Sequence, residues 1–131
     1  MKLLVGYNGS APAQRALELA CEKGRKNPDA LVYVVTSMEG GSSESLEDIQ
    51  AVEEKLQQAK DFLLKANVTC ETLQLARGLE PGEDLVKFAE DNSVDHIFIG
   101  IEKKSRTRKL LLGSTAQFII LKGPCPVTTT K

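Results

Sequence analysis

The segment GIEKKSRTRKLLLGST, residues 100–115, combines residue types that bind phosphate groups. Gly113, Ser114 and Thr115 stand at the beginning of an apolar segment, where the first backbone N–H groups of a helix are unpaired and carry the positive end of its dipole. The glycine lets a phosphate approach the backbone, and the two hydroxyls are hydrogen-bond donors. Glu102 is the one acid in a strongly basic segment, whose basic residues are Lys103, Lys104, Arg106, Arg108 and Lys109. The pattern predicts an anion-binding loop.

A plainer interpretation of the same residues is an ordinary helix start that follows a solvated basic loop. The chain has neither the P-loop pattern GxxxxGK[ST] nor the dinucleotide pattern GxGxxG. On spacing alone, this plainer interpretation is slightly favoured. A second candidate loop, GYNGS at residues 6–10, follows the first apolar run of the chain. Both loops are candidates because ligands of open parallel sheets bind beyond the carboxyl ends of the strands.

The chain offers few groups for catalysis or metal binding. His96 is the only histidine, and we expect it at the start of a strand, at the sheet end opposite the ligand site. The cysteines are odd in number, far apart and without CxxC spacing, which favours free thiols over disulfides or zinc; they are Cys21, Cys70 and Cys125. No catalytic triad, metal cluster or buried acid pair can be assembled. We therefore expect a protein that is not an enzyme.

Composition excludes several classes of protein. A chain of 131 residues with 41% hydrophobic and 27% charged residues is typical of one soluble globular domain, which we expect to span 1–131. A net charge of −1 argues against nucleic acid or an anionic membrane as the main partner. The longest apolar runs are far too short to span a membrane. Met1–Val5 begins like a strand and not like a signal peptide, so we expect a cytoplasmic protein.

Strand-like and helix-like segments alternate along the chain. Apolar runs rich in β-branched residues predict strands, and apolar residues at helical spacing predict helices between them. This alternation predicts an α/β fold, a Rossmann-like open sheet of five mainly parallel strands with helices on both faces. We expect the weakest strand, 68–76, at an edge of the sheet. The expected strands are 2–7, 30–37, 68–76, 94–100 and 126–130, and the helices begin near 10, 45, 81 and 114.

Local signals mark the ends of these helices. Ser10 is a predicted N-cap, and Gly24 is predicted to end the first helix in a left-handed conformation. Ser45 and Asp48 form an approximate capping box. The position of Asp84, in the first turn of the third helix, is explained by the attraction of its carboxylate to the positive end of the helix dipole.

The chain resembles the universal stress proteins over nearly its whole length. The likeness rests on blocks that follow that family's order: a first strand with Gly9-Ser10 and a helix, RGLEPGEDLVKFAEDNSVDHIFIG, LLLGSTAQFII and PCPVTTT. The family's nucleotide motif is G-x2-G-x9-G-[ST]. Gly100 and Gly113-Ser114 match it at the family's spacing, while Lys103 stands in place of the second glycine.

This resemblance implies a Rossmann-like fold that binds ATP, with or without Mg²⁺. The adenine would lie near Asn8 and Val35 and against Ile99, and the ribose and phosphates would pass Gly100 and Lys103 toward the start of the last helix. The implied ATP-binding residues are Tyr7, Asn8, Val35, Ile99, Gly100, Lys103, Gly113, Ser114 and Thr115.

The chain departs from the family pattern at two positions of this site. Asn8 stands where ATP-binding members usually carry Asp, so a neutral amide replaces a carboxylate. Lys103 removes the conformational freedom of a glycine and adds a positive charge. Arg106 likewise stands where the family often has a glycine.

Three functional hypotheses follow from the resemblance. The first is an ATP-binding stress-response sensor or regulator that forms a homodimer through the last strand, although Thr128, Thr129 and Thr130 replace the apolar residues common in the family. The second is a protein-interaction module of the same fold that does not bind nucleotide. The third is slow ATP hydrolysis or self-phosphorylation, for which Lys103 and the helix dipole would stabilise charge on the γ-phosphate.

Overall fold

The strands and helices of the chain alternate as expected. The computed structural model describes residues 1–38, 45–102 and 112–131, so Lys103 and most of the basic segment lie outside the described residues. The elements are β1 (Lys2–Gly6), α1 (Ala11–Lys26), β2 (Leu31–Ser37), α2 (Leu46–Lys65), β3 (Thr69–Leu75), α3 (Pro81–Asp91), β4 (His96–Gly100), α4 (Ser114–Lys122) and β5 (Val127–Thr130).

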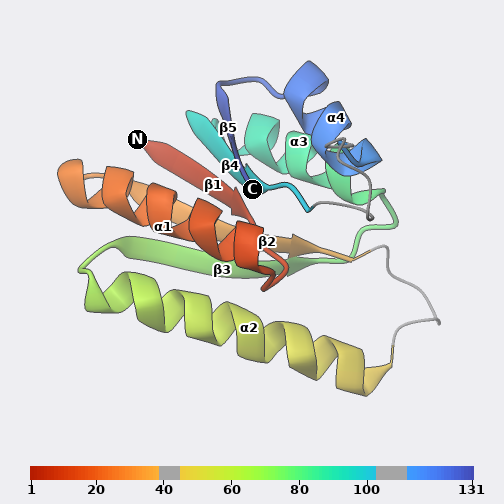
Figure 1. Cartoon of the computed structure of the whole chain (residues 1–131), viewed down its shortest axis with the longest axis horizontal. Coiled ribbons are helices and arrows are strands. Elements are labelled where there is room, and N and C mark those ends of the chain that lie inside the picture. The colour runs from red at the N-terminus through yellow and green to blue at the C-terminus, as the bar shows by residue number, and fades with distance from the viewer. Residues whose placement is uncertain (39–44, 103–111) are drawn as a thin grey trace.

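The strands form one open sheet in the order β3-β2-β1-β4-β5 (Figure 1). Every neighbouring pair is parallel, as in the pairing of Leu3 with Val32 on one side and with His96 on the other. Strand β3 lies at an edge of the sheet, as predicted. Because β1 is followed by β2 on one side and the chain later returns to β4 on the other, the strand order reverses between β1 and β4.

The helices cover the two faces of the sheet in pairs. Alternate residues of the central strands point to opposite faces, so each strand contributes to two cores. Leu3 and Val5 of β1 pack with α1 and α2, whereas Leu4 packs on the face that α3 and α4 cover (Figure 1). The predicted parallel α/β fold is therefore confirmed. No helix among the described residues is both long and apolar enough to cross a membrane.

The helix caps are as predicted, with one exception. The Ser10 side chain accepts a hydrogen bond from the Ala13 amide, and Ser45 and Asp48 form a reciprocal capping box. The prediction that Gly24 ends the first helix is wrong, because α1 continues to Lys26. Gly24 is a packing residue: a Cβ there would lie 2.9 Å from Cγ1 of Val68.

His96 lies at the amino end of β4, away from the carboxyl ends of the strands, as expected. Its ring stacks on Phe98 with centroids 4.3 Å apart. Lys23 Nζ lies 2.8 Å from Nδ1, and because a lysine only donates, Nδ1 accepts and Nε2–H donates to Thr128 Oγ1 at 2.6 Å. Burial, with a smaller effect of the Lys23 charge, lowers the pKa of His96 from its ordinary value of 6.5.

This lowered pKa predicts that acid weakens the fold through His96. The unfolded chain then binds a proton on His96 more readily than the folded chain, so the free energy of unfolding decreases as the pH falls below about 6.5. Urea unfolding at about pH 7.5 and about pH 5.5 measures this loss. A His96→Gln variant, which cannot titrate there, should lose less stability over the same interval. An equal loss in both proteins would assign the pH dependence to the carboxylates instead.

Candidate functional site

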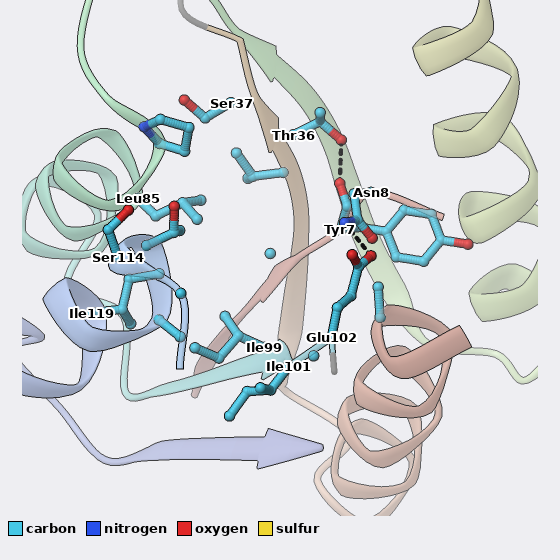
Figure 2. A pocket seen from close by; sticks show the side chains of 18 residues that line it. Tyr7, Asn8, Thr36, Ser37, Leu85, Ile99, Ile101, Glu102, Ser114 and Ile119 are labelled. Atoms are coloured by element: carbon cyan, nitrogen blue, oxygen red, sulfur yellow. Dashed lines mark hydrogen bonds between the residues drawn. The ribbon is translucent and has the colours of Figure 1, made fainter. Parts of the chain in front are cut away.

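A pocket of about 340 Å³ opens at the carboxyl ends of β1, β2 and β4. It lies between the strand ends and the helices α3 and α4 (Figure 2). Its walls come from the segments just after β1 and β4, which flank the point where the strand order reverses. This is where open parallel sheets bind ligands.

The structure brings together the predicted site residues that it describes. The pocket is lined by Tyr7, Asn8, Val35, Ile99, Gly100, Gly113, Ser114 and Thr115, whereas the ninth, Lys103, lies outside the described residues. Tyr7 differs from the others in the direction of its side chain. Its ring points away from the pocket (Figure 2), and its hydroxyl donates to Gln14 Oε1 at 3.1 Å.

One wall of the pocket is apolar and buried. Its side chains form a surface at the ends of β2 and β4 and on α3 and α4; they belong to Val35, Leu85, Ile99, Ile101 and Ile119. Gly6 lies at the end of β1 among them, and a Cβ there would approach Ile99 Cγ2 to 3.2 Å and Leu85 Cδ1 to 3.3 Å. This surface suits a flat aromatic ring, which is stabilised by the removal of apolar area from water.

The amino terminus of α4 forms the donor side of the pocket, next to Leu85 and Ile119 of the apolar wall (Figure 2). Gly113 is the N-cap of this helix and supplies no side-chain hydrogen bond, while Ser114, Thr115 and Ala116 all line the pocket. The first intrahelical bond runs from the Gln117 amide to the Gly113 carbonyl at 3.0 Å. The amides before it have no intrahelical acceptor and carry the positive end of the dipole, so they can bind an anion.

Asn8 and Glu102 join the segments that follow β1 and β4. Asn8 Nδ2 donates to Glu102 Oε1 at 3.3 Å (Figure 2), and the backbone amide of Ser10 donates to Asn8 Oδ1 at 3.0 Å. From the sequence, Glu102 is identified only as the one acidic residue in a basic segment, and no place in the site is predicted for it. Its place in the pocket depends on the pairing of β1 with β4, which brings residues 94 positions apart into contact.

The sequence patterns also did not predict a buried polar cluster that lies beside the pocket. Asp84 is fully buried and accepts hydrogen bonds from Arg77 Nε and Ser37 Oγ, each at 2.7 Å, and Ser37 lines the pocket. The explanation of Asp84 by the helix dipole alone is therefore incomplete. Its spacing of four residues to Phe88 places it on the buried face of α3, and this periodicity is the signal that could have identified it.

Gly100 has a structural role besides its place in the pocket. A Cβ at this position would lie 2.4 Å from the carbonyl carbon of Pro12 and 2.5 Å from the amide nitrogen of Ala13. The carboxyl end of β4 therefore touches the first turn of α1 directly. The hydroxyl of Thr130 also donates to the Pro12 carbonyl, at 2.7 Å, so β5 anchors the same turn.

Comparison with known proteins identifies related sequences and structures. Residues 1–131 match the model of a family described as the universal stress protein family. The universal stress protein Slr1230 of Synechocystis is 31% identical over 128 residues, which are 98% of this chain and 42% of that protein, so the chain spans less than half of that relative.

Two solved structures have the same fold and similar sequences. A universal stress protein from Archaeoglobus fulgidus superposes with a TM-score of 0.87 at 38% identity, covering 99% of this chain and 96% of the other. A universal stress protein from the same organism, solved in complex with dAMP, gives a TM-score of 0.81 at 35% identity, covering 99% and 95%.

Proposed function

Because the chain belongs to the universal stress protein family, we propose that its pocket binds an adenine nucleotide and that the protein acts as a nucleotide-dependent stress regulator. The observation that carries this proposal is the pairing of an apolar wall with the uncapped amino terminus of α4 in one pocket. The apolar wall suits the base, and the helix terminus suits the phosphates. The dAMP bound to a relative of 35% identity supports the same class of ligand.

The finer form of the proposal is that ATP, with or without Mg²⁺, is the ligand. A triphosphate extends beyond Ser114 and Thr115, and Lys103 would then supply charge to it. We propose further that the protein is not a fast enzyme, since its one histidine, His96, lies at the amino end of β4, away from the pocket, and cannot act there as a general base. Slow hydrolysis or self-phosphorylation is the alternative, and it would require Mg²⁺ and disappear with Ser114→Ala.

We also propose a cytoplasmic homodimer that pairs through β5. This strand bonds β4 along one edge, and no other strand of the described residues covers its second edge. Thr128 and Thr130 direct their hydroxyls to His96 and Pro12, so these threonines serve contacts within the chain. Light scattering on a size-exclusion column tests the dimer, and a monomer mass at the highest concentration studied would contradict it.

The first test is titration calorimetry of the nucleotide-stripped protein with Mg-ATP and with dAMP, after mass spectrometry of any small molecule that co-purifies. Heat of binding in the micromolar range, or a co-purified adenine nucleotide, supports the proposal. The absence of both would favour the alternative, a protein-interaction module of the same fold. The carboxylate of Glu102 in the pocket is the observation that favours this alternative, because it repels phosphate.

Gly113→Val should abolish nucleotide binding and leave the fold intact. Gly113 has φ −66° and ψ 162°, an extended conformation open to valine, so the backbone needs no change. The branched side chain would block the approach of a phosphate to the amides of α4. Calorimetry measures the affinity, and thermal unfolding checks the fold. Thr69→Val, an exposed position of β3 outside the pocket, is the control that should bind normally. Retained affinity in Gly113→Val would show that the phosphates bind elsewhere.

A further inference from the structure

The polar groups of the pocket differ in kind from one side to the other. Ser114 and Glu102 lie on opposite sides of it (Figure 2). The Ser114 side presents hydrogen-bond donors from the amino terminus of α4, whereas Glu102 presents a carboxylate, which only accepts. A ligand that reaches both sides must therefore carry its negative charge at one and hydrogen-bond donors at the other.

The Glu102 carboxylate is tied to its place by Asn8. Both polar atoms of the Asn8 amide are engaged, since Oδ1 accepts from the Ser10 amide at 3.0 Å and Nδ2 donates to Glu102 at 3.3 Å. The Ser10 bond fixes which end of the amide faces Glu102, because that end must donate. Asn8 uses one of the roughly four acceptor positions of a carboxylate, so further donors can bind to Glu102.

The arrangement of the pocket indicates which part of a nucleotide meets Glu102. The phosphate is repelled by the carboxylate and is stabilised by α4, on the other side. The base fits the apolar wall formed by Val35 and Leu85, at the end of β2 and on α3. A sugar that connects these two parts would lie over the ends of β1 and β4, at Gly6 and Gly100, and Glu102 follows the end of β4 by two residues. The donors of a ribose are its 2′- and 3′-hydroxyls, and acidic side chains bind ribose hydroxyls in other α/β nucleotide sites.

We propose that Glu102, held by Asn8, makes this pocket selective for ribonucleotides over 2′-deoxyribonucleotides. Two neighbouring hydroxyls of a ribose can bind the two oxygens of one carboxylate, whereas a 2′-deoxyribose offers only one of them. This inference rests on the proposed function, because it assigns a part of the same ligand to a part of the same pocket.

The experiment is calorimetric titration of the wild-type chain and of Glu102→Gln with AMP and with 2′-deoxy-AMP. The wild type should bind AMP roughly tenfold more tightly, which is a typical value for a hydrogen bond to a charged group. Glutamine keeps the side-chain length and an acceptor for Asn8 but lacks the charge, so the ratio of the two dissociation constants should fall to below about threefold. Glu54→Gln, on the exposed side of α2, makes the same change of charge away from the pocket and should keep the wild-type ratio.

The ratio of the two affinities separates selectivity from a structural effect, since a general disturbance of the pocket would weaken both ligands alike. If the wild type binds both nucleotides equally, or if Glu102→Gln keeps the full preference for AMP, the inference is overturned and the proposed function stands. If the wild type binds neither AMP, 2′-deoxy-AMP nor Mg-ATP, the proposed function itself is overturned, and this inference with it.

Discussion

Arg77→Met should lower the free energy of unfolding by about 3 kcal/mol. The substitution leaves the fully buried Asp84 carboxylate with the Ser37 hydroxyl and without its cationic partner. Removing one partner of a buried ion pair typically costs about 3–5 kcal/mol, because the remaining charge is neither solvated nor compensated. We expect the lower end, since 35% of the Arg77 side chain is exposed and water can take part of its place.

Urea unfolding of Arg77→Met and of Arg25→Met measures this difference. Arg25 pairs with Glu22 at 3.4 Å on the surface of α1, where both side chains are more than half exposed. Its loss should cost less than about 0.5 kcal/mol. Similar losses in the two variants would mean that the Arg77–Asp84 contact contributes no more than a surface pair. Because Ser37 lines the pocket and bonds to Asp84, nucleotide affinity should also fall in Arg77→Met and not in Arg25→Met.

Gly100→Ala should destabilise the chain by about 3 kcal/mol, the upper end of the usual cost of added atoms in a packed interior. The added Cβ would lie within 2.7 Å of three backbone atoms of Pro12 and Ala13, and backbone cannot move aside as the end of a flexible side chain can. Relief requires that the first turn of α1 move away from β4, which would also stretch the bond from Thr130 to the Pro12 carbonyl. Thermal and urea unfolding measure the loss, and failure to fold is the extreme of the same result.

Gly78→Ala is the control for Gly100→Ala. Gly78 has a φ of +73°, and nothing lies within 4 Å of a Cβ built there, so its cost comes from backbone conformation alone, about 1 kcal/mol. Gly100→Ala should lose clearly more than this control. A loss of about 1 kcal/mol or less would refute the close contact between β4 and α1. The result also bears on the family motif, since it would show that the first glycine of that motif is needed by the empty protein.

The fold was predictable because its signals are local and agree with one another. The β-branched runs, the helical spacing of apolar residues and the capping box formed by Ser45 and Asp48 all appear within short windows of sequence. Gly24 was misinterpreted because its reason lies in another element: the glycine ends no helix but makes room for Val68. Local rules give the options at such a position, and tertiary packing decides among them.

The site was predictable where residues follow strands directly, and less so where side-chain direction decides. Tyr7 continues the alternation of Leu3 and Val5, so the period of two already indicates that its ring points to the α1 side, away from the pocket. Glu102 and Arg77 could not be placed from spacing, because their partners Asn8 and Asp84 belong to other segments. The contribution of Lys103 stays a prediction.

The reversal of strand order between β1 and β4 places the pocket at the boundary between two parts of the sheet. One part contains β1, β2 and β3, and the other contains β4 and β5. Residues from both parts line the pocket. A ligand that contacts both parts stabilises their association, because its binding free energy must be lost before they can separate. When the pocket is filled, the amide hydrogens of both parts would exchange with solvent more slowly, and they would do so as one cooperative unit. The bound molecule would thus hold the two parts of the sheet together, and the free energy needed to separate them would rise with the concentration of the ligand.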